Sequence, residues 1–347
     1  MKALEQIVND LHPGTPLRGR QLRPAPPSTL DEILSPIPYT DFLSCYLRKE
    51  FCHIPGDRGR FRLLLPWTTL SQILHEHRLD YPRLRLIRNG ETLPPQSYID
   101  YLTDRRGARY TRVRADGLEN ELARGAMLHL AAVDELNPEL ARLAESISSK
   151  LKTTVMVNVC AGTHNSRGFA THWDGHDVLV LQVHGRKHWR IYGITQPSPL
   201  RIGVGMDAGP QTDKPTVPVW EGTIEEGDLI YLPRGCWHSA EGTADPTLHL
   251  TVGIINPTGH DFLTWIRDTL LEEEVFRADL PDLDAPAVKA QHVEALRTAL
   301  ASKCTVQAME QFLALTHEKR TSRRRVTFPT SDTNADASDP KMGIKLT

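Results

Sequence analysis

Two residues with metal-binding side chains, His172 and Asp174, lie two positions apart just before an apolar run over 178–183. In an extended backbone, residues i and i+2 project to the same side, so this imidazole and carboxylate can bind one metal ion together. A further histidine, His238, follows the turn-then-strand segment 227–233, which can return the chain to the same end of a barrel. Two histidines and one carboxylate, with coordination positions left open, form the facial triad of non-haem Fe(II) oxygenases. We therefore expect a metal site made by His172, Asp174 and His238.

A lysine, Lys187, opens a strand expected over residues 187–192. The alternation of side chains puts Lys187 on the same face as Trp189 and Ile191, and this apolar face should point into the barrel. An unpaired buried charge costs several kcal/mol, about 3–5 when its partner is removed, so an interior lysine requires an anion. The distal carboxylate of a 2-oxoacid cosubstrate would supply that anion. The alternative is a strand-end lysine whose ammonium reaches water.

Polar side chains also interrupt otherwise apolar strands at Asn158, Gln182 and Thr251. Buried polar groups need hydrogen-bonding partners, so a polar ligand in the cavity would account for them. Each could instead bond to backbone, and Thr251 carries the least weight. Four further histidines compete for the metal: His176, His184, His188 and His249.

Composition sets the class of protein. The 347 residues are 39% hydrophobic and 24% charged, with a formal net charge of -2, which gives no reason to expect a nucleic-acid partner. The five cysteines are scattered, with no CxxC pair, and this favours a reducing compartment over a disulfide framework. Neither a signal peptide nor a bilayer-length apolar run is visible. We therefore expect a cytoplasmic protein that does not enter membranes.

Periodicity and turn residues divide the chain into four parts. Residues 1–38 are expected to form a short helix over 2–12 and a proline-rich linker. Residues 39–258 hold helices over 39–51, 67–77 and 137–151. Short strands then follow, typical of a β-sandwich or barrel, over 154–160, 178–184, 187–192, 216–220, 229–232 and 248–255.

The rest of the chain is helical again, and then polar. Helices are expected over 262–271, 286–300 and 305–315, within a region 259–329, and a disordered tail over 330–347. Five arginines lie between Arg105 and Arg114. We read them as a solvated basic face, and a substrate-steering patch is the alternative.

These residues carry a resemblance to a known family. The run from Asn158 to Tyr192, with His172-Trp173-Asp174 and Lys187-x-Trp189, resembles the core of the JmjC-type cupin oxygenases. It is most similar to their ribosomal oxygenase branch, which hydroxylates side chains of ribosomal proteins. The segment Gly227 to His238 resembles that family's second metal motif, and the likeness extends over about residues 40–329.

The resemblance implies a mainly β fold with helical flanks, a double-stranded β-helix (jelly roll), followed by a C-terminal helical dimerisation bundle. It implies Fe(II) held by His172, Asp174 and His238, and 2-oxoglutarate held by Lys187 with Asn158 nearby. We add Thr251 to this cosubstrate pocket on its polarity alone. The sequence departs from the family at Cys160, where a tyrosine is frequent beside the cosubstrate. It also ends too soon for the family's winged-helix domain, so a ribosomal substrate does not carry over directly.

The expected activity is an Fe(II)- and 2-oxoglutarate-dependent dioxygenase that uses O2 to hydroxylate an unactivated C–H. Its substrate would be an amino-acid side chain of a protein or peptide, and the enzyme would be a homodimer. Two alternatives stay open: a hydroxylase of a small molecule such as an amino acid or natural-product intermediate, and a non-catalytic metal-binding cupin that serves as an interaction module.

Overall fold

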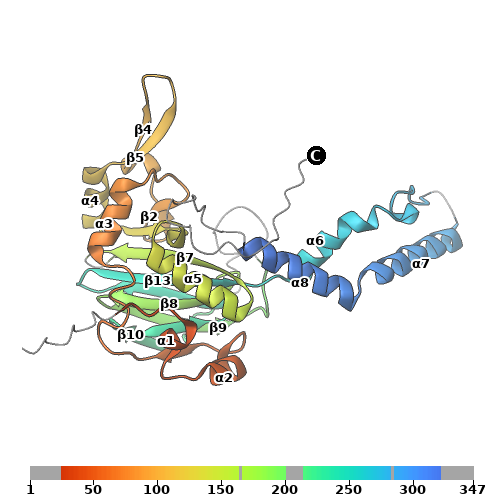
Figure 1. The fold of residues 1–347 in the computed structure, drawn as a ribbon, viewed down its shortest axis with the longest axis horizontal. Helices are drawn as coiled ribbons and strands as arrows, with labels where there is room; N and C mark the ends of the chain where they lie inside the picture. Colours follow the sequence, from red (N-terminus) through yellow and green to blue (C-terminus); the bar gives the residue numbers. More distant parts are fainter. Residues whose placement is uncertain (1–24, 164–165, 201–213, 283–284, 322–347) are drawn as a thin grey trace, which may run out of the picture. The chain divides into compact units, whose positions relative to one another are not determined.

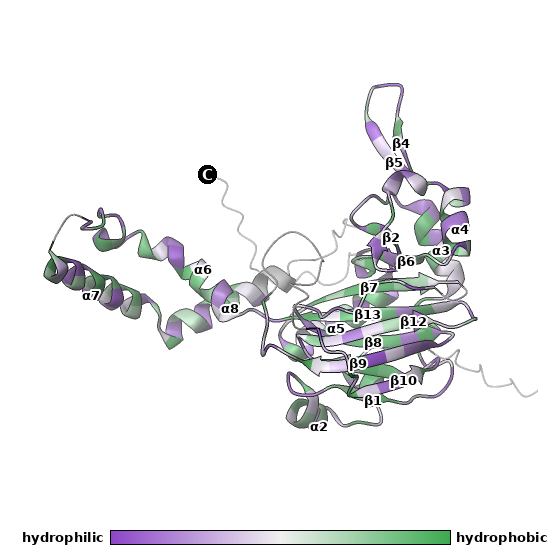
Figure 2. Cartoon of the chain, turned by 180° about the vertical axis from the view of Figure 1, so that it is seen from behind, coloured by the Kyte–Doolittle hydropathy of each residue, from purple (hydrophilic) through white to green (hydrophobic). Residues whose placement is uncertain are grey.

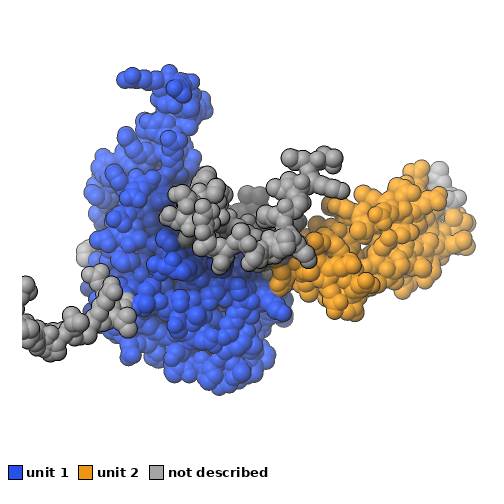
Figure 3. Space-filling view, in the orientation of Figure 1, with its two compact units in different colours: residues 1–256 blue, residues 257–347 orange. Residues whose placement is uncertain are grey.

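The structure, a computed structural model, describes residues 25–163, 166–200, 214–282 and 285–321 (Figure 1). The chain forms two compact units, residues 1–256 (unit 1) and 257–347 (unit 2), shown in different colours in Figure 3. The helix expected over 2–12 and the tail expected from 330 lie outside the described residues. Within the described ranges, none of the helices has the length and apolar character needed to cross a membrane.

Unit 1 is built on antiparallel strands in two main sheets. The larger has the order β1-β11-β8-β13-β7-β6-β2-β3, the smaller β10-β9-β12, and β4 and β5 form a separate hairpin. The strands are β1 Cys52–Ile54, β2 Leu84–Arg88, β3 Glu91–Thr92, β4 Ile99–Thr103, β5 Arg109–Val113, β6 Met127–Leu130, β7 Thr154–Gly162, β8 Asp177–His184, β9 Lys187–Ile194, β10 Trp220–Ile224, β11 Leu229–Leu232, β12 Cys236–Gly242 and β13 Thr247–Ile255. The predicted mainly β jelly roll with helical flanks is confirmed.

The helices and short helical turns up to α5 belong to unit 1, where they flank the sheets, and the later ones form unit 2. They are α1 Leu30–Leu34, α2 Tyr39–Asp41, η1 Phe42–Tyr46, α3 Trp67–Glu76, η2 Pro95–Ser97, α4 Ala115–Ala123, η3 Val133–Glu135, α5 Pro138–Leu151, α6 Gly259–Leu270, η5 Glu274–Phe276, α7 Pro286–Lys303 and α8 Val306–Thr321.

The central strand β8 is buried on both faces, which explains its nearly continuous apolar sequence. Leu179 and Leu181 point into the large core beneath the helices. Val178 and Val180 point the other way, into a smaller core shared with Trp189 of β9. Alternate side chains of β8 therefore face two different cores: one lies under the helices that cover the larger sheet, and the other lies between the two sheets.

Helix α5 covers the first of these cores. Its buried stripe contains Leu140, Leu143 and Ile147 at helical spacing. The helix begins at Pro138 because Asn137 caps it: the Asn137 side chain accepts hydrogen bonds from the backbone N–H of Glu139 and Leu140, at 2.9 and 3.0 Å.

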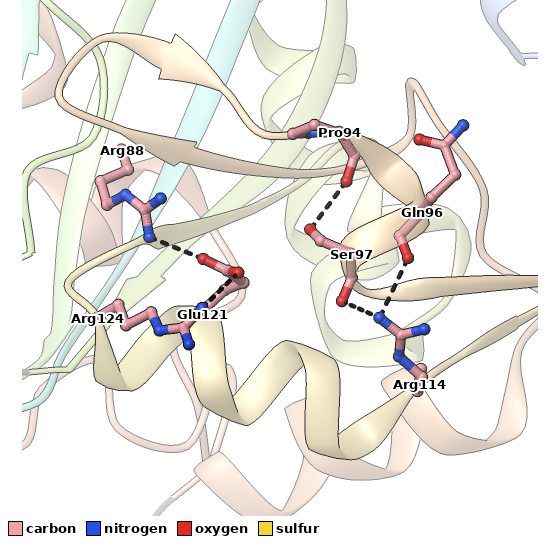
Figure 4. A network of polar contacts seen from close by, with 7 residues as sticks. All are labelled: Arg88, Pro94, Gln96, Ser97, Arg114, Glu121 and Arg124. Carbon is pink, nitrogen blue, oxygen red and sulfur yellow. Dashed lines mark hydrogen bonds and ion pairs between the residues drawn. The ribbon is translucent and has the colours of Figure 1, made fainter.

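Arginine contacts fix α4 beside strand β2, the neighbour of the edge strand β3 (Figure 4). Glu121 of α4 pairs with Arg88 of β2 at 2.7 Å and with Arg124 at 3.3 Å. At the other end of the helix, Arg114 donates to the backbone carbonyls of Gln96 and Ser97. Arg114, one of the five clustered arginines, therefore has a structural role.

Unit 2 contains α6, α7 and α8. Phe262, Trp265 and Phe312 form a ring cluster with centroids 5.7–6.1 Å apart. No residue of α7 is buried. Hydrophobic residues, green in Figure 2, recur along α6 to α8, and several of them have exposed side chains. The three predicted helices are confirmed, with α7 and α8 extending further than expected.

Several predicted elements differ. The helix expected over 39–51 ends at Tyr46, and Arg48 has a positive φ of 61°. A strand was expected over 216–220, but β10 occupies Trp220–Ile224. Strands β1, β4, β5 and β12 were not predicted at all.

Candidate active site

One potential metal-binding group is found among the described residues, and it consists of His172, Asp174 and His238. One ligand atom from each lies within 4.8 Å of the others. The two imidazole centroids are 4.3 Å apart, and His238 Nε2 lies 3.6 Å from Asp174 Oδ2. The structure thus brings together the three side chains that the sequence singled out, although they come from a loop and from β12.

Backbone hydrogen bonds orient both histidines for coordination. His172 Nδ1 lies 2.8 Å from the carbonyl oxygen of Ala170, and His238 Nδ1 lies 2.9 Å from that of Cys236. A carbonyl only accepts, so each Nδ1 must carry the proton, and each Nε2 keeps its lone pair. Ring orientation by such a bond is the usual outer-shell arrangement of metal-binding histidines. Burial lowers the pKa of His238 to about 4, which also keeps it neutral.

The loop before β8 is held against β12. His172 and His238 form an antiparallel bridge, with reciprocal N–H to carbonyl bonds of 3.0 and 2.8 Å. The carbonyl of Asp174 accepts from the N–H of Gly235 at 3.0 Å. The buried Asp177 side chain accepts from the N–H of Arg234 at 2.8 Å. Three links therefore hold the loop that carries His172 and Asp174 against β12.

The β2–β3 turn holds the beginning of the same loop. Asn89 and Gly90, with φ of 53° and 87°, close this turn with the positive φ angles that a tight hairpin requires. Their N–H groups donate to the carbonyls of Arg167 and Gly168 at 2.9 and 2.8 Å. A Cβ at Gly90 would lie 3.1 Å from Ala170, so the close approach also favours glycine.

The triad lies in a cavity of about 100 Å³ between the two sheets, here called the triad cavity. Lys187 lines it and is 1% exposed. Its Nζ contacts Met127 Sδ at 3.5 Å, and none of the ion pairs of the described residues involves it. Burial lowers the pKa of Lys187, as expected for an ammonium without a carboxylate beside it. The alternative of a lysine reaching water is therefore wrong.

The other predicted pocket residues are placed as follows. Asn158 and Thr251 are Cα partners across β7 and β13, and both line the triad cavity. Asn158 Oδ1 accepts from the N–H of Ala132 at 3.0 Å, so part of its polarity serves the backbone. Gln182 is not in the lining, because its amide donates to Thr247 and to the carbonyl of His184.

Sequence reasoning missed Met127, His129 and Phe169, which line the triad cavity, whereas it had named Cys160 and His249. His129, Cys160 and His249 form one cross-strand row on β6, β7 and β13. Arg85 Nη2 donates to His129 Nδ1 at 3.2 Å. The alternation of His129 with Leu128 and Leu130 was the available signal. Among the histidines that compete for the metal, His176 and His249 line the cavity, whereas His184 and His188 do not.

A larger hollow of about 830 Å³ lies elsewhere in unit 1, between α3, α4 and β5. Leu128 and Ala161 line it, whereas their neighbours Met127 and Cys160 line the triad cavity, so the sheet separates the two. The arginines at 105, 106 and 109 lie on the projecting β4–β5 hairpin (Figure 1), are exposed, and do not line the triad cavity.

Comparison with known proteins identifies this architecture. The JmjC domain family matches residues 129–262, which include the whole triad. This part of the chain is a JmjC domain. The fold resembles that of YcfD, a ribosomal oxygenase from Escherichia coli solved in complex with cobalt and 2-oxoglutarate, with a TM-score of 0.53 and 18% identity, covering 81% of this chain and 71% of that chain.

Curated relatives of this chain carry the name bifunctional lysine-specific demethylase and histidyl-hydroxylase NO66. The Drosophila grimshawi protein is 27% identical over 65% of this chain and 30% of its own length. The Caenorhabditis elegans protein is 30% identical over 55% of this chain and 25% of its own length. The chain thus spans about a third or less of these relatives. The predicted resemblance to JmjC-type cupins is confirmed.

Proposed function

We propose that this JmjC protein is an Fe(II)- and 2-oxoglutarate-dependent oxygenase that hydroxylates an amino-acid side chain of a protein or peptide. One observation carries the proposal: the His172–Asp174–His238 triad shares a cavity with the buried ammonium of Lys187. This chemistry needs a metal site and an anion-binding group close together, and the triad cavity contains both.

The residues present fit the metal. Two bare imidazole Nε2 atoms and one carboxylate supply the donor set of a facial triad, and the hydrogen bonds to Ala170 and Cys236 hold both rings. When bound, Fe(II) would supply the redox chemistry that activates O2 with 2-oxoglutarate. The protein's part is to bind the cosubstrate through Lys187, Asn158 and Thr251 and to exclude water from the site.

The size of the cavity favours a side chain over a free small molecule as substrate. Its volume of about 100 Å³ is well below the roughly 300–1,000 Å³ of typical ligand pockets. A bound cosubstrate would fill much of the triad cavity. This favours a substrate of which only the end of a side chain enters the cavity. The relatives named as histidyl-hydroxylases and the ribosomal oxygenase YcfD agree with a protein substrate.

The remaining parts of the proposal concern organisation. Residues 39–258 would act as the catalytic domain in the cytoplasm, and residues 259–329 would form a homodimer. Exposed apolar side chains of unit 2, among them Leu271 and Val306 at 56% and 76%, support the second point because such surfaces favour association. Residues 1–38 and 330–347 would stand outside both functions.

The test measures metal content and succinate release by the full chain reconstituted with Fe(II), supplied with 2-oxoglutarate, O2 and ribosomal extract, peptides or amino acids. His172→Ala and Asp174→Ala should each lose iron and reduce turnover about 100-fold or more while circular dichroism stays unchanged. His184→Gln, outside the triad cavity, is the control. Turnover at the wild-type rate in both triad variants would contradict the proposal. A wild-type chain that binds iron stoichiometrically but releases no succinate would favour a non-catalytic module.

A further inference from the structure

The triad cavity contains a second buried polar group without a partner. His249 of β13 is 4% exposed, and its Nδ1 is shielded from solvent with no hydrogen-bonding partner. The Nε1 of Trp189, in edge-to-face contact with His249 at 5.7 Å, is also buried and unpaired. Buried polar atoms are nearly always hydrogen-bonded, so both point to a ligand that this cavity is shaped to hold.

Strand register places His249 toward the β8–β9 turn, because it pairs with Gln182 of β8, whereas Asp177, next to the loop of the triad, pairs with Ile254 further along β13. His238 of β12 pairs with Ile191 of β9, and Lys187 lies four residues earlier, at the start of β9 and opposite Gly242. His249 does not belong to the metal-binding group, and Lys187 is the charged residue that most affects its ring. An acceptor near both would therefore lie at the Lys187 end of the cavity.

The neighbours of His249 cannot supply an equivalent donor. Its partner across β7 is Cys160, and a thiol is a weak donor. Its partner across β8 is Gln182, whose amide N–H groups already donate to His184 and Thr247. Burial and the nearby Lys187 ammonium lower the pKa of His249, so its ring is neutral and offers one N–H.

We propose that His249 completes, with Lys187, a two-donor site for the distal carboxylate of the 2-oxoacid cosubstrate. This inference rests on the proposed function. An ammonium and an imidazole N–H together match the two oxygens of one carboxylate, and charge-assisted bonds of this kind are stronger than neutral ones. His249 is thus a binding residue for the cosubstrate, and the sequence motif that marks Lys187 does not include it.

The test is calorimetric binding to the Mn(II)-loaded full chain, which measures affinity without turnover. Two ligands are compared: 2-oxoglutarate and 2-oxopentanoate, which has a methyl group in place of the distal carboxylate. His249→Leu should weaken 2-oxoglutarate binding about 10- to 100-fold and leave 2-oxopentanoate binding unchanged. His249→Asn, which keeps a donor, should recover part of the loss. Lys187→Met should show the same ligand selectivity, and His184→Gln is the control.

The outcomes separate the two levels of the proposal. If the wild-type chain loaded with metal does not bind 2-oxoglutarate, the proposed function fails. If the wild type binds it and His249→Leu binds it equally well, or loses both ligands equally, only the role of His249 is overturned. Because His249→Leu could fail to fold, 15N spectra of the histidine-labelled, Zn(II)-loaded wild type give a second test. Adding 2-oxoglutarate should create one solvent-protected imidazole N–H close to the Trp189 indole, and its absence would overturn the inference.

Discussion

At the scale of single residues, the histidines of this chain differ because the strands bury them to different depths. His129 is 4% exposed, and its Nδ1 accepts a hydrogen bond from Arg85. Burial, and then the positive charge of Arg85, lower the pKa of His129 from 6.5 to about 3. A proton on this ring would cost the hydrogen bond and place two positive charges together, so the native state requires the neutral form.

This arrangement predicts an acid-sensitive fold. The unfolded chain takes up a proton near pH 6.5, whereas folded His129 does so only near pH 3. The stabilising effect is therefore complete above pH 6.5 and is lost as the pH falls toward 3, by up to about 1.4 kcal/mol per pH unit. Urea unfolding of the metal-free protein between pH 7.5 and 5 should show this fall. The slope should be smaller in His129→Gln, and parallel curves would contradict the assignment.

At the scale of elements, α5 supports the sheet from behind, and its first turn depends on Asn137. Asn137→Ala removes the acceptor for two backbone N–H groups of a buried helix start and should lower the free energy of unfolding by about 1 kcal/mol. Asn137→Ser keeps a capping oxygen and should lose much less. Chemical denaturation of the two variants makes the comparison. Equal losses would show that packing, and not the cap, fixes this end of α5.

Helices and strands with a regular pattern of apolar residues could be predicted from the sequence. Strands that form only because they pair with a distant strand could not. The stripe of α5 and the apolar run of β8 carry their own signal. Strand β12 does not, because Cys236-Trp237-His238-Ser239-Ala240-Glu241-Gly242 reads as a polar loop and becomes a strand by pairing with β9. The arginines of β5 make its sequence look like a polar loop too, so the β4–β5 hairpin was not predicted.

The residues of the site also divide into those that local spacing could predict and those that it could not. His172, Asp174 and Lys187 could be found because their spacing on or beside β8 and β9 is local. The assignment of His238 rested on a motif, since its strand was not predicted. His249 was considered for the metal, and only the register of β13 places it at the Lys187 end of the cavity. Long-range register is not contained in local spacing.

At the scale of the whole molecule, unit 2 leaves much apolar surface uncovered within itself. Val293 and Leu300 of α7, seven residues apart, are 52% and 36% exposed. Seven residues are close to two helical turns, so both lie on one face. The substitutions Val293→Asp and Leu300→Asp together should convert the proposed homodimer to a monomer in light scattering. Gln291→Asp on the same helix is the control, and a dimer that persists in the double variant would contradict the role of this face.

The antiparallel bridge between His172 and His238 has a consequence for how the protein acquires its metal. Because backbone bonds set the ligand spacing, we expect the chain to fold without its metal, unlike small zinc domains, where the metal drives folding. A rigid pair of imidazoles and one carboxylate also accepts any divalent ion of suitable size. In the natural order of stabilities, Fe(II) ranks below copper and zinc. We therefore expect the bound ion to depend on which divalent ions the folded chain meets.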